Sequence, residues 1–250
     1  MFAWYSGDPY ISRRAIVLYT HNEQPELGTD QEQVALLNKA FKIHFFSSLD
    51  ANRLIAEGLD KSKVRIVNGA IDIGVTSIGL DWKSRSNLVV MASRFGYRKN
   101  PEFLFSIIKR LTDWDFLLLG RGWDAFLKEK EAQALTNFDY LELNKFSIKN
   151  NFPLAKLFLS TSILEGGPIP LLESMYSGVS PIVSNTGFAQ DVILENKAQH
   201  IFALNSEVDD VETLIRNCPQ LSERNISHVQ QFSWDRIARI VYEDFLVLVG

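Results

Sequence analysis

Short apolar runs alternate with helix-length segments along almost the whole chain of 250 residues. Runs such as Ala15–Tyr19, Leu88–Ala92 and Leu157–Ser160 have the length and residue types of buried strands. Strands that are separated by helices pair in parallel and are joined by right-handed crossovers. The order of the elements therefore predicts an α/β fold built on parallel sheets.

The full set of predicted elements follows from the same pattern. The predicted strands are 15–19, 43–47, 64–68, 88–92, 116–119, 140–143, 157–160, 181–184 and 201–204. The predicted helices are 30–41, 50–57, 101–111, 124–134, 170–177, 188–195, 207–217, 221–230 and 234–247.

Composition and charge exclude several classes of protein. Apolar residues make up 46% of the chain and charged residues 22%, which is typical of a globular protein. With 26 basic and 30 acidic residues the net charge is −4, so we expect no non-specific binding of nucleic acid through overall charge. Cys218 is the only cysteine, which excludes an internal disulfide and a multi-cysteine zinc site.

The sequence offers no targeting or membrane signal. No run approaches the roughly 20 apolar residues of a membrane span, so we expect no transmembrane segment. The first residues contain Asp8 and carry their basic pair after the apolar part, which is unlike a signal peptide. We therefore expect a cytoplasmic protein, with peripheral attachment to a membrane as an alternative.

A change of pattern divides the chain. Residues 69–87 lack a strong period, contain three glycines, and are interpreted as a connection between domains. The predicted division is a short first domain over residues 1–73 and a complete Rossmann-like domain over residues 74–233. A final helix over residues 234–250 is expected to pack back toward the first domain.

Two glutamates flank a Gly-Gly-Pro turn between a predicted strand and a predicted helix. Glu165 precedes Gly166, Gly167 and Pro168, and Glu173 lies eight positions after Glu165, one turn inside the helix. Unpaired N–H groups at a helix start favour a phosphate, and a carboxylate can accept hydrogen bonds from two vicinal hydroxyls. The segment predicts a site for a phosphorylated, hydroxyl-rich ligand at the carboxyl edge of the sheet.

A second candidate segment follows the strand predicted over residues 88–92. Ser93 and Arg94 come directly after this strand, and Arg98 and Lys99 precede the next helix. The three cations lie within six residues at the carboxyl edge of the sheet. Because a diphosphate leaving group gains negative charge as its bond breaks, Arg94 and Lys99 are candidates to neutralise it.

Residues 88–242 resemble the nucleotide-sugar-binding half of the retaining glycosyltransferase family 4, which has the GT-B fold. The features that carry the resemblance are the loop of Arg94 and Lys99, Leu119-Gly120-Arg-Gly122, the pair Glu165/Glu173, the helix ending at Gly178, Pro181-Ile-Val-Ser, Thr186-Gly187 and Phe232-Ser-Trp234. The resemblance implies a GT-B-like fold with a complete C-terminal and a truncated N-terminal Rossmann-like domain.

The resemblance also implies roles for particular residues. Glu165 would contact the hydroxyls of the donor sugar and Glu173 the ribose, while Arg94 and Lys99 would bind the diphosphate. The donor would be a nucleoside diphosphate sugar, linked to UDP or GDP, and family members transfer the sugar with retention and without a metal. The acceptor would be a glycan, a lipid-linked compound or another molecule with a hydroxyl group.

Further residues are implied on the same basis. The other implied donor-binding residues are Gly166, Gly167, Pro168, Ser93, Gly120 and Gly122. The segment Tyr19-Thr-His21 resembles the strand end that faces the reacting sugar, which implies a catalytic role for His21. A solvated loop histidine is the alternative for this residue.

The sequence departs from the family pattern in three places. Asp191 stands where many members have Glu, and Val67 replaces a proline of the junction between domains. The first domain is shorter than the family's acceptor-binding half. Either the acceptor side is minimal, or its missing part would come from another chain, such as a second copy or a partner, or from an upstream segment. A donor-binding module that is inactive alone is therefore the second hypothesis.

Two competing motifs lead to other interpretations. Gly120-Arg-Gly122 after a strand, with Glu142 at the end of the next strand, fits part of a dinucleotide-binding fingerprint and makes an NAD(P)-binding enzyme the third hypothesis. The bulky Trp123 argues against it, because the glycines of that fingerprint allow close packing. The preferred interpretation of residues 120–123 is a loop near the base of the donor. Asp113 and Asp115 form an Asp-x-Asp sequence, which resembles a metal-binding motif. Because they precede their strand, and so lie away from the carboxyl edge of the sheet, they are interpreted as capping and turn residues.

Overall fold

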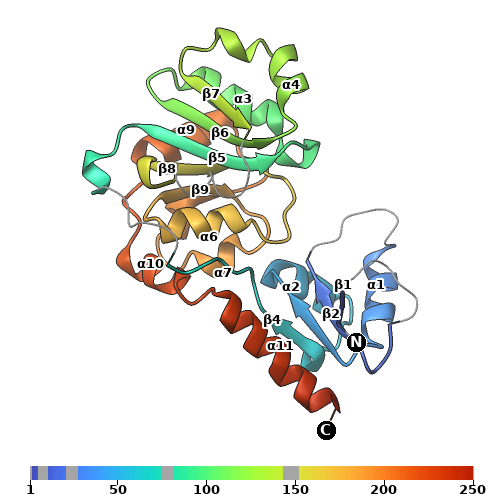
Figure 1. Cartoon of the computed structure of the whole chain (residues 1–250). Helices are drawn as coiled ribbons and strands as arrows, with labels where there is room; N and C mark the ends of the chain where they lie inside the picture. The colour runs from blue at the N-terminus through green and yellow to red at the C-terminus, as the bar shows by residue number, and fades with distance from the viewer. Residues whose placement is uncertain (1, 5–10, 21–27, 75–80, 143–151, 250) are drawn as a thin grey trace.

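The computed structural model describes residues 2–4, 11–20, 28–74, 81–142 and 152–249, and contains two β-sheets flanked by helices (Figure 1). The strand order is β1-β2-β3-β4 in the first sheet and β10-β9-β8-β5-β6-β7 in the second. All of these strand pairs are parallel. The prediction of an α/β fold with parallel sheets is confirmed.

Nine of the strands correspond to predicted ones. The strands are β1 (Phe2–Trp4), β2 (Ile16–Tyr19), β3 (Lys42–Phe45), β4 (Val64–Ile66), β5 (Leu88–Arg94), β6 (Asp115–Arg121), β7 (Phe138–Glu142), β8 (Leu157–Ser160), β9 (Ser180–Ser184) and β10 (Ile201–Phe202). Among them only β1 was not predicted, because three residues are too few to show a period.

The helices agree less closely with their predicted ranges. They are α1 (Asp30–Leu37), α2 (Ser48–Ala56), α3 (Pro101–Arg110), α4 (Asp124–Glu129), α6 (Ile169–Tyr176), α7 (Ala189–Val192), α8 (Lys197–His200), α9 (Val208–Asn217), α10 (Glu223–Val229) and α11 (Trp234–Val249). The helix predicted over 124–134 ends at Glu129, because Glu131 adopts a left-handed conformation with φ 52°. The helix predicted over 188–195 is reduced to α7, and α8 was not predicted.

The central strands of the second sheet are buried on both faces. Val89 and Val90 are adjacent in β5 and both fully buried, but they belong to different clusters of core side chains. Val89 belongs to the same cluster as Phe105 of α3, on one face of the sheet. Val90 belongs to the same cluster as Leu172 of α6, on the other face. Burial on both faces explains why the strands of this domain read as continuous apolar runs.

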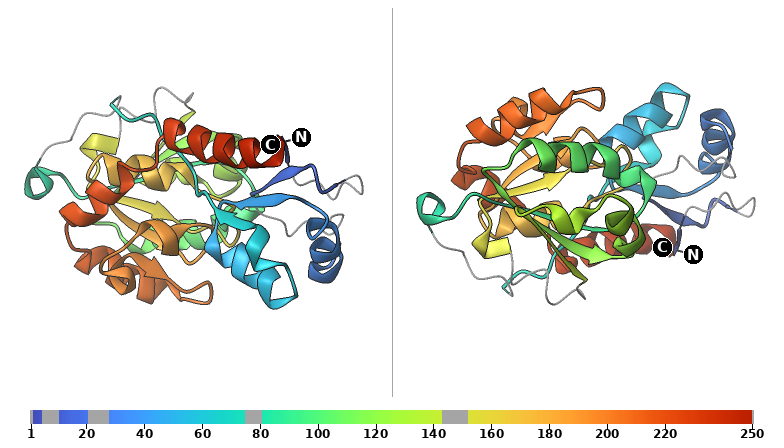
Figure 2. Two further views of the ribbon diagram at one scale, coloured as in Figure 1. Left: turned by 90° about the horizontal axis from the view of Figure 1, so that it is seen from below. Right: turned by 90° about the horizontal axis from the view of Figure 1, so that it is seen from above.

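The helix α11 returns from the second sheet and lies along the first one (Figure 2). Near its start, Ser233 forms a parallel bridge with Ile71. Further along, Asp244 accepts hydrogen bonds from His44 of β3, at 2.6 Å, and from Arg65 of β4, at 2.9 Å. The helix α11 therefore links β3 and β4 to the C-terminal end of the chain. The domain boundaries at 73/74 and 233/234 stay a prediction.

The buried His200 generates a prediction on the pH dependence of stability. Burial lowers the pKa of His200 and outweighs the hydrogen bond that its Nδ1–H donates, over 2.8 Å, to the backbone oxygen of Pro181. A pKa that is lower in the folded than in the unfolded state makes stability fall as the pH drops through the unfolded value of about 6.5.

We therefore expect a larger free energy of unfolding at pH 7.5 than at pH 5.5, measured by urea denaturation at both values. The variant His200→Gln should show a smaller difference between the two. Part of the difference should persist, because burial also lowers the pKa of His44 and of His228. An equal pH dependence in the variant and the wild type would contradict the expectation.

Candidate functional site

The strand order of the second sheet fixes the place of the candidate site. The chain runs from β5 to β6 and β7 on one side of the sheet, and then crosses to β8, β9 and β10 on the other side. The direction of winding therefore reverses between β5 and β8. Open α/β sheets bind ligands at such a reversal point, beside the carboxyl ends of the strands. A pocket of about 290 Å³ lies there.

Four segments supply the polar and charged side chains that line this pocket. They are the end of β5 with Ser93 and Arg94, the turn with Arg98 and Lys99, the end of β8 with Ser160, Thr161 and Ser162, and the loop with Glu165, Gly167 and Pro168. The two segments that the sequence singled out thus meet in one cavity. The sequence places both segments at the carboxyl edge of the sheet, although more than 60 residues separate Lys99 from Glu165.

Backbone contacts hold the two loops together. The N–H of Ile163 donates to the backbone oxygen of Arg98 over 2.8 Å, and the hydroxyl of Thr161 donates to the backbone oxygen of Lys99, also over 2.8 Å. The guanidinium of Arg98 donates to the backbone oxygen of Leu164 over 2.9 Å. The walls of the pocket are therefore joined by main-chain bonds as well as by side chains.

Glu165 is the carboxylate that lines the pocket in the described part of the chain, with 8% of its surface exposed. It forms an ion pair with Lys99, accepts a hydrogen bond from Arg98 over 2.9 Å and accepts another from the hydroxyl of Ser162 over 2.7 Å. Burial by itself would raise the pKa of Glu165, but the charge of Lys99 and these hydrogen bonds lower it. Glu165 is therefore ionised at neutral pH.

Lys99 is the partner of this carboxylate and is itself largely enclosed, with 13% of its side chain exposed. Burial lowers the pKa of Lys99, and the nearby Glu165 offsets only part of that effect. A buried lysine of this kind depends on its counter-ion, because an unpaired charge in such a place is costly.

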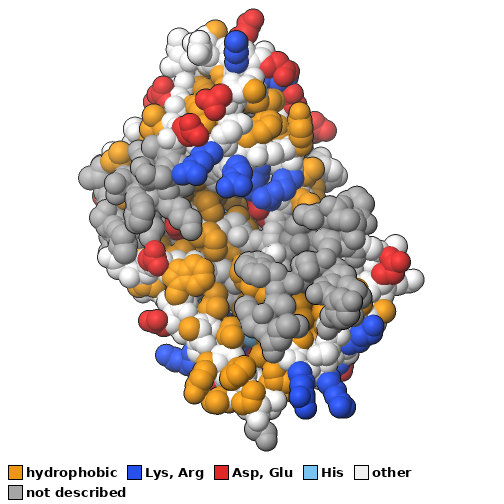
Figure 3. All heavy atoms as spheres, turned by 45° about the vertical axis from the view of Figure 1, so that its right-hand side comes forward, with side chains coloured by type: hydrophobic (Ala, Val, Ile, Leu, Met, Phe, Trp, Pro, Cys, Tyr) orange, Lys and Arg blue, Asp and Glu red, His pale blue; other side chains and the backbone are white. Residues whose placement is uncertain are grey.

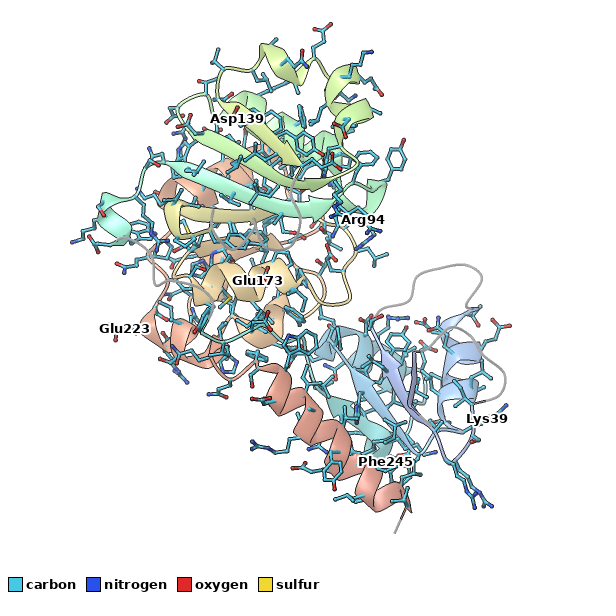
Figure 4. All side chains as sticks on the ribbon, viewed as in Figure 1. Lys39, Arg94, Asp139, Glu173, Glu223 and Phe245 are labelled. Carbon is cyan, nitrogen blue, oxygen red and sulfur yellow. The ribbon has the colours of Figure 1, made fainter. Side chains whose placement is uncertain are left out.

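Arg94 lies at the end of β5 (Figure 4). Its side chain is exposed, whereas that of Lys99 is largely enclosed. Figure 3 shows Lys and Arg side chains gathered across the middle of one face of the molecule. Together with Arg98 and Lys99, Arg94 makes the lining of the pocket strongly cationic at one wall. Such a wall attracts an anion, and a fork-shaped guanidinium suits phosphate oxygens.

Glu173 lies on α6, the helix that begins directly after Pro168 (Figure 4). It is half-buried and is not among the residues that line the pocket. The helix N-terminus itself, with Ile169 and Pro170, does line it. Glu173 therefore stands one turn behind the pocket wall, on the element that the sequence predicted.

Other predicted site residues lie elsewhere. Gly166 neighbours the pocket without lining it, and Gly120 and Gly122 stand at the end of β6 and just after it. A Cβ on Gly120 would lie 1.8 Å from the backbone oxygen of Ser93, so this glycine allows β5 and β6 to approach. His21 lies outside the described residues.

Trp123 ends the loop 120–123, whose sequence is interpreted as lying near the base of the donor. It is fully buried, lines the pocket, and its indole N–H donates to the backbone oxygen of Ser93 over 2.9 Å. Its ring fills the space that a dinucleotide fingerprint would leave open after Gly122, which disfavours the NAD(P) interpretation. Ser162 was missed, since a serine at a strand end gives no signal until its carboxylate partner is known.

Asp113 lies in the turn before β6 and pairs with Arg216. It accepts two hydrogen bonds from Arg216, at 2.8 and 2.9 Å, which agrees with its interpretation as a turn residue. Within the described part of the chain, no group of three or more His, Cys, Asp or Glu side chains is arranged to hold a metal ion. Over the same residues no helix has both the length and the apolar character needed to cross a membrane.

Comparison with known proteins identifies the family. The chain matches the family model of "Glycosyl transferases group 1" over residues 77–226, which is more than half of its length. The chain therefore belongs to the group 1 glycosyltransferases. No curated protein sequence matches it significantly.

Several solved structures are similar in fold. Sucrose-phosphate synthase from Thermosynechococcus elongatus gives a TM-score of 0.77 at 15% identity, over 94% of this chain and 68% of that one. A glycosyltransferase from Rickettsia africae also gives 0.77 at 15% identity, over 94% and 71%. The Anabaena protein HepE in complex with UDP and glucose gives 0.73 at 14% identity, over 93% and 71%.

These likenesses show the fold alone, because the identities are low. They confirm the GT-B-like architecture, with a complete Rossmann-like second domain and a reduced first one. The chain covers about two thirds of the length of these similar structures.

The buried ion pair of the pocket generates a prediction on stability. We expect Glu165→Ala to lower the free energy of unfolding by about 3 kcal/mol, because it leaves Lys99 enclosed without its counter-ion. Arg98→Ala should cost less than about 1 kcal/mol, because 51% of the Arg98 side chain is exposed. Urea denaturation of both variants measures the difference, and a Glu165→Ala variant as stable as Arg98→Ala would show that the pair is not structural.

Proposed function

We propose that the chain transfers a sugar, with retention of configuration, from a UDP- or GDP-linked donor to a hydroxyl group. The observation that carries this proposal is the pocket at the reversal point of the second sheet, where three cations face a buried carboxylate and a helix N-terminus. Membership of the group 1 glycosyltransferases supports transfer of a sugar, and the cationic wall supports a diphosphate-linked donor.

The proposed role of Arg94 and Lys99 is to stabilise the leaving diphosphate. As the bond to the sugar breaks, negative charge builds up on the diphosphate oxygens, and fixed cations lower the energy of that state. Lys99 is already held in place by Glu165, so little conformational entropy is lost when an anion binds. Cations of the protein would thus do the work that a metal ion does elsewhere, and we propose a metal-independent reaction.

The proposed role of Glu165 is to orient the sugar. Its carboxylate receives hydrogen bonds from Ser162 and Arg98 in addition to the contact with Lys99, yet two carboxylate oxygens have about four lone-pair directions. A sugar hydroxyl can therefore donate to the same group. Glu173 lies one turn after the start of α6, and we propose that it contacts the ribose. The backbone N–H groups near Gly167 are proposed to contact oxygens of the donor.

A second candidate function is a donor-binding module that needs another chain for catalysis. The reduced first domain favours it, because the described part of that domain contains four strands against six in the second. The acceptor would be a glycan or a lipid-linked compound in both cases. Turnover by the pure chain decides between them, since a module would bind nucleotide without transferring or hydrolysing the sugar.

The proposed function is tested at Arg94. We expect the wild type to bind UDP or GDP in calorimetric titration, and Arg94→Ala to bind more weakly. We also expect this variant to lower turnover of the corresponding nucleotide sugar by about 10²–10³, the usual effect of losing one charge-stabilising contact in a transition state.

The matched control is Arg224→Ala, which removes an exposed arginine of α10 that pairs with Glu195 and does not line the pocket. It should bind and react as the wild type does. Failure of the wild type to bind either nucleotide, or equal binding by wild type and Arg94→Ala, would refute the proposal.

A further inference from the structure

The first and second domains are joined by a carboxylate that the sequence marked only as a departure from its family. Asp191 lies in α7, in the segment after β9. Its Oδ2 accepts a hydrogen bond from the backbone N–H of Ser48 over 2.9 Å and another from the side-chain amide of Asn68 over 3.0 Å. Its Oδ1 accepts from the hydroxyl of Ser48. Both partners belong to the first domain or to the segment that leaves it.

The first of these contacts is at the start of a helix. Ser48 is the first residue of α2, so its N–H has no partner inside the helix. A carboxylate at this end is favoured by the helix dipole as well as by the hydrogen bond. Asp191 thus supplies from the second domain a capping charge for a helix of the first.

The second contact involves a residue in an uncommon conformation. Asn68 has φ 54°, in the left-handed region that asparagine tolerates better than most residues. It is buried, and its amide also donates to the backbone oxygen of Phe46 over 2.9 Å. Asn68 therefore holds the end of β3, the exit of β4 and Asp191 at one point.

The turn before α7 connects this contact to the donor pocket. On one side, the hydroxyl of Ser47 donates to the backbone oxygen of Gly187 over 2.6 Å. On the other side, a Cβ on Gly187 would lie 3.0 Å from Cδ of Pro168 and 3.1 Å from the backbone oxygen of Glu165. The turn at Gly187 is thus packed between the first domain and the loop that carries Glu165.

Phe188 strengthens the same connection. It is fully buried, and a Cβ on Gly167 would lie 2.5 Å from its ring, while a Cβ on Gly69 would lie 3.0 Å from it. The Phe188 ring is therefore a single side chain that contacts both the pocket loop and the junction between the domains. Because closely packed side chains cannot move independently, a shift of the first domain would also displace Gly167 through direct contact.

From these contacts we infer that Asp191 is a positioning residue. Its hydrogen bonds to Ser48 of α2 and to Asn68, which we call the clamp, fix the turn at Gly187 and Phe188. This turn then fixes the position of the pocket loop 165–168. The inference rests on the proposed function for its consequence, which is the alignment of the donor. Asp191 itself does not line the pocket, so it acts through Glu165 and Gly167 rather than by touching the donor.

Amide hydrogen exchange, followed by mass spectrometry without any ligand, tests the clamp. We expect Asp191→Ala to speed exchange in peptides that cover residues 163–174 and the start of α2 by about tenfold or more, because the loss of even one hydrogen bond to a charged group has an effect of that size. Exchange in β5 to β7 should not change. Asp191→Glu, which keeps the carboxylate, should restore most of the protection.

The matched control is Glu195→Ala. Glu195 follows α7 in the same segment and carries the same charge, but it pairs with Arg224 within the second domain. It should leave the exchange of residues 163–174 unchanged. Equal exchange in wild type and Asp191→Ala, equal acceleration in Glu195→Ala, or acceleration spread over the whole chain would overturn the inference.

Titration of UDP and GDP against the same variants tests the consequence separately. We expect Asp191→Ala to bind about tenfold more weakly than the wild type, and Asp191→Glu to bind nearly as well. Unchanged affinity in Asp191→Ala would overturn the link between the clamp and the pocket. If the wild type binds neither nucleotide, the proposed function fails, and the exchange experiment still decides whether the clamp exists.

Discussion

The buried ion pair between Glu165 and Lys99 is the contact on which the rest of the site depends. It joins the carboxyl end of β8 to the turn after β5, at the place where the winding of the second sheet reverses. A carboxylate and an ammonium that are both largely enclosed must stay together, because either one alone would carry an unpaired buried charge. The pair thereby keeps cations and carboxylate at the same cavity before any ligand arrives.

The arrangement of the two domains follows from a second set of polar contacts. Asp191, Ser48 and Asn68 meet at the edge of the first sheet, while Asp244 on α11 ties His44 and Arg65 from the opposite end of the chain. The first domain is therefore held at two places, one close to the pocket loop and one along α11. Only the first of them is in a position to affect the geometry of Glu165.

The fold was predictable from sequence to a larger extent than the site. The apolar runs at 88–92 and 157–160 could be assigned because strands buried on both faces leave a strong signal, whereas β1 and α8 were too short to leave one. Glu165 and Lys99 were identified as candidates, but their pairing depends on the strand order, which no local pattern contains. Asp191 was not assigned a role, because its partners Ser48 and Asn68 are distant in sequence and its importance lies in its hydrogen bonds.

A crystal structure of the chain with bound UDP or GDP tests the central claim most directly. The account predicts that the diphosphate lies in the cavity between β5 and β8, within hydrogen-bond distance of Arg94 and Lys99, with the ribose toward α6. A nucleotide bound at any other place, or a diphosphate turned away from both cations, would contradict it.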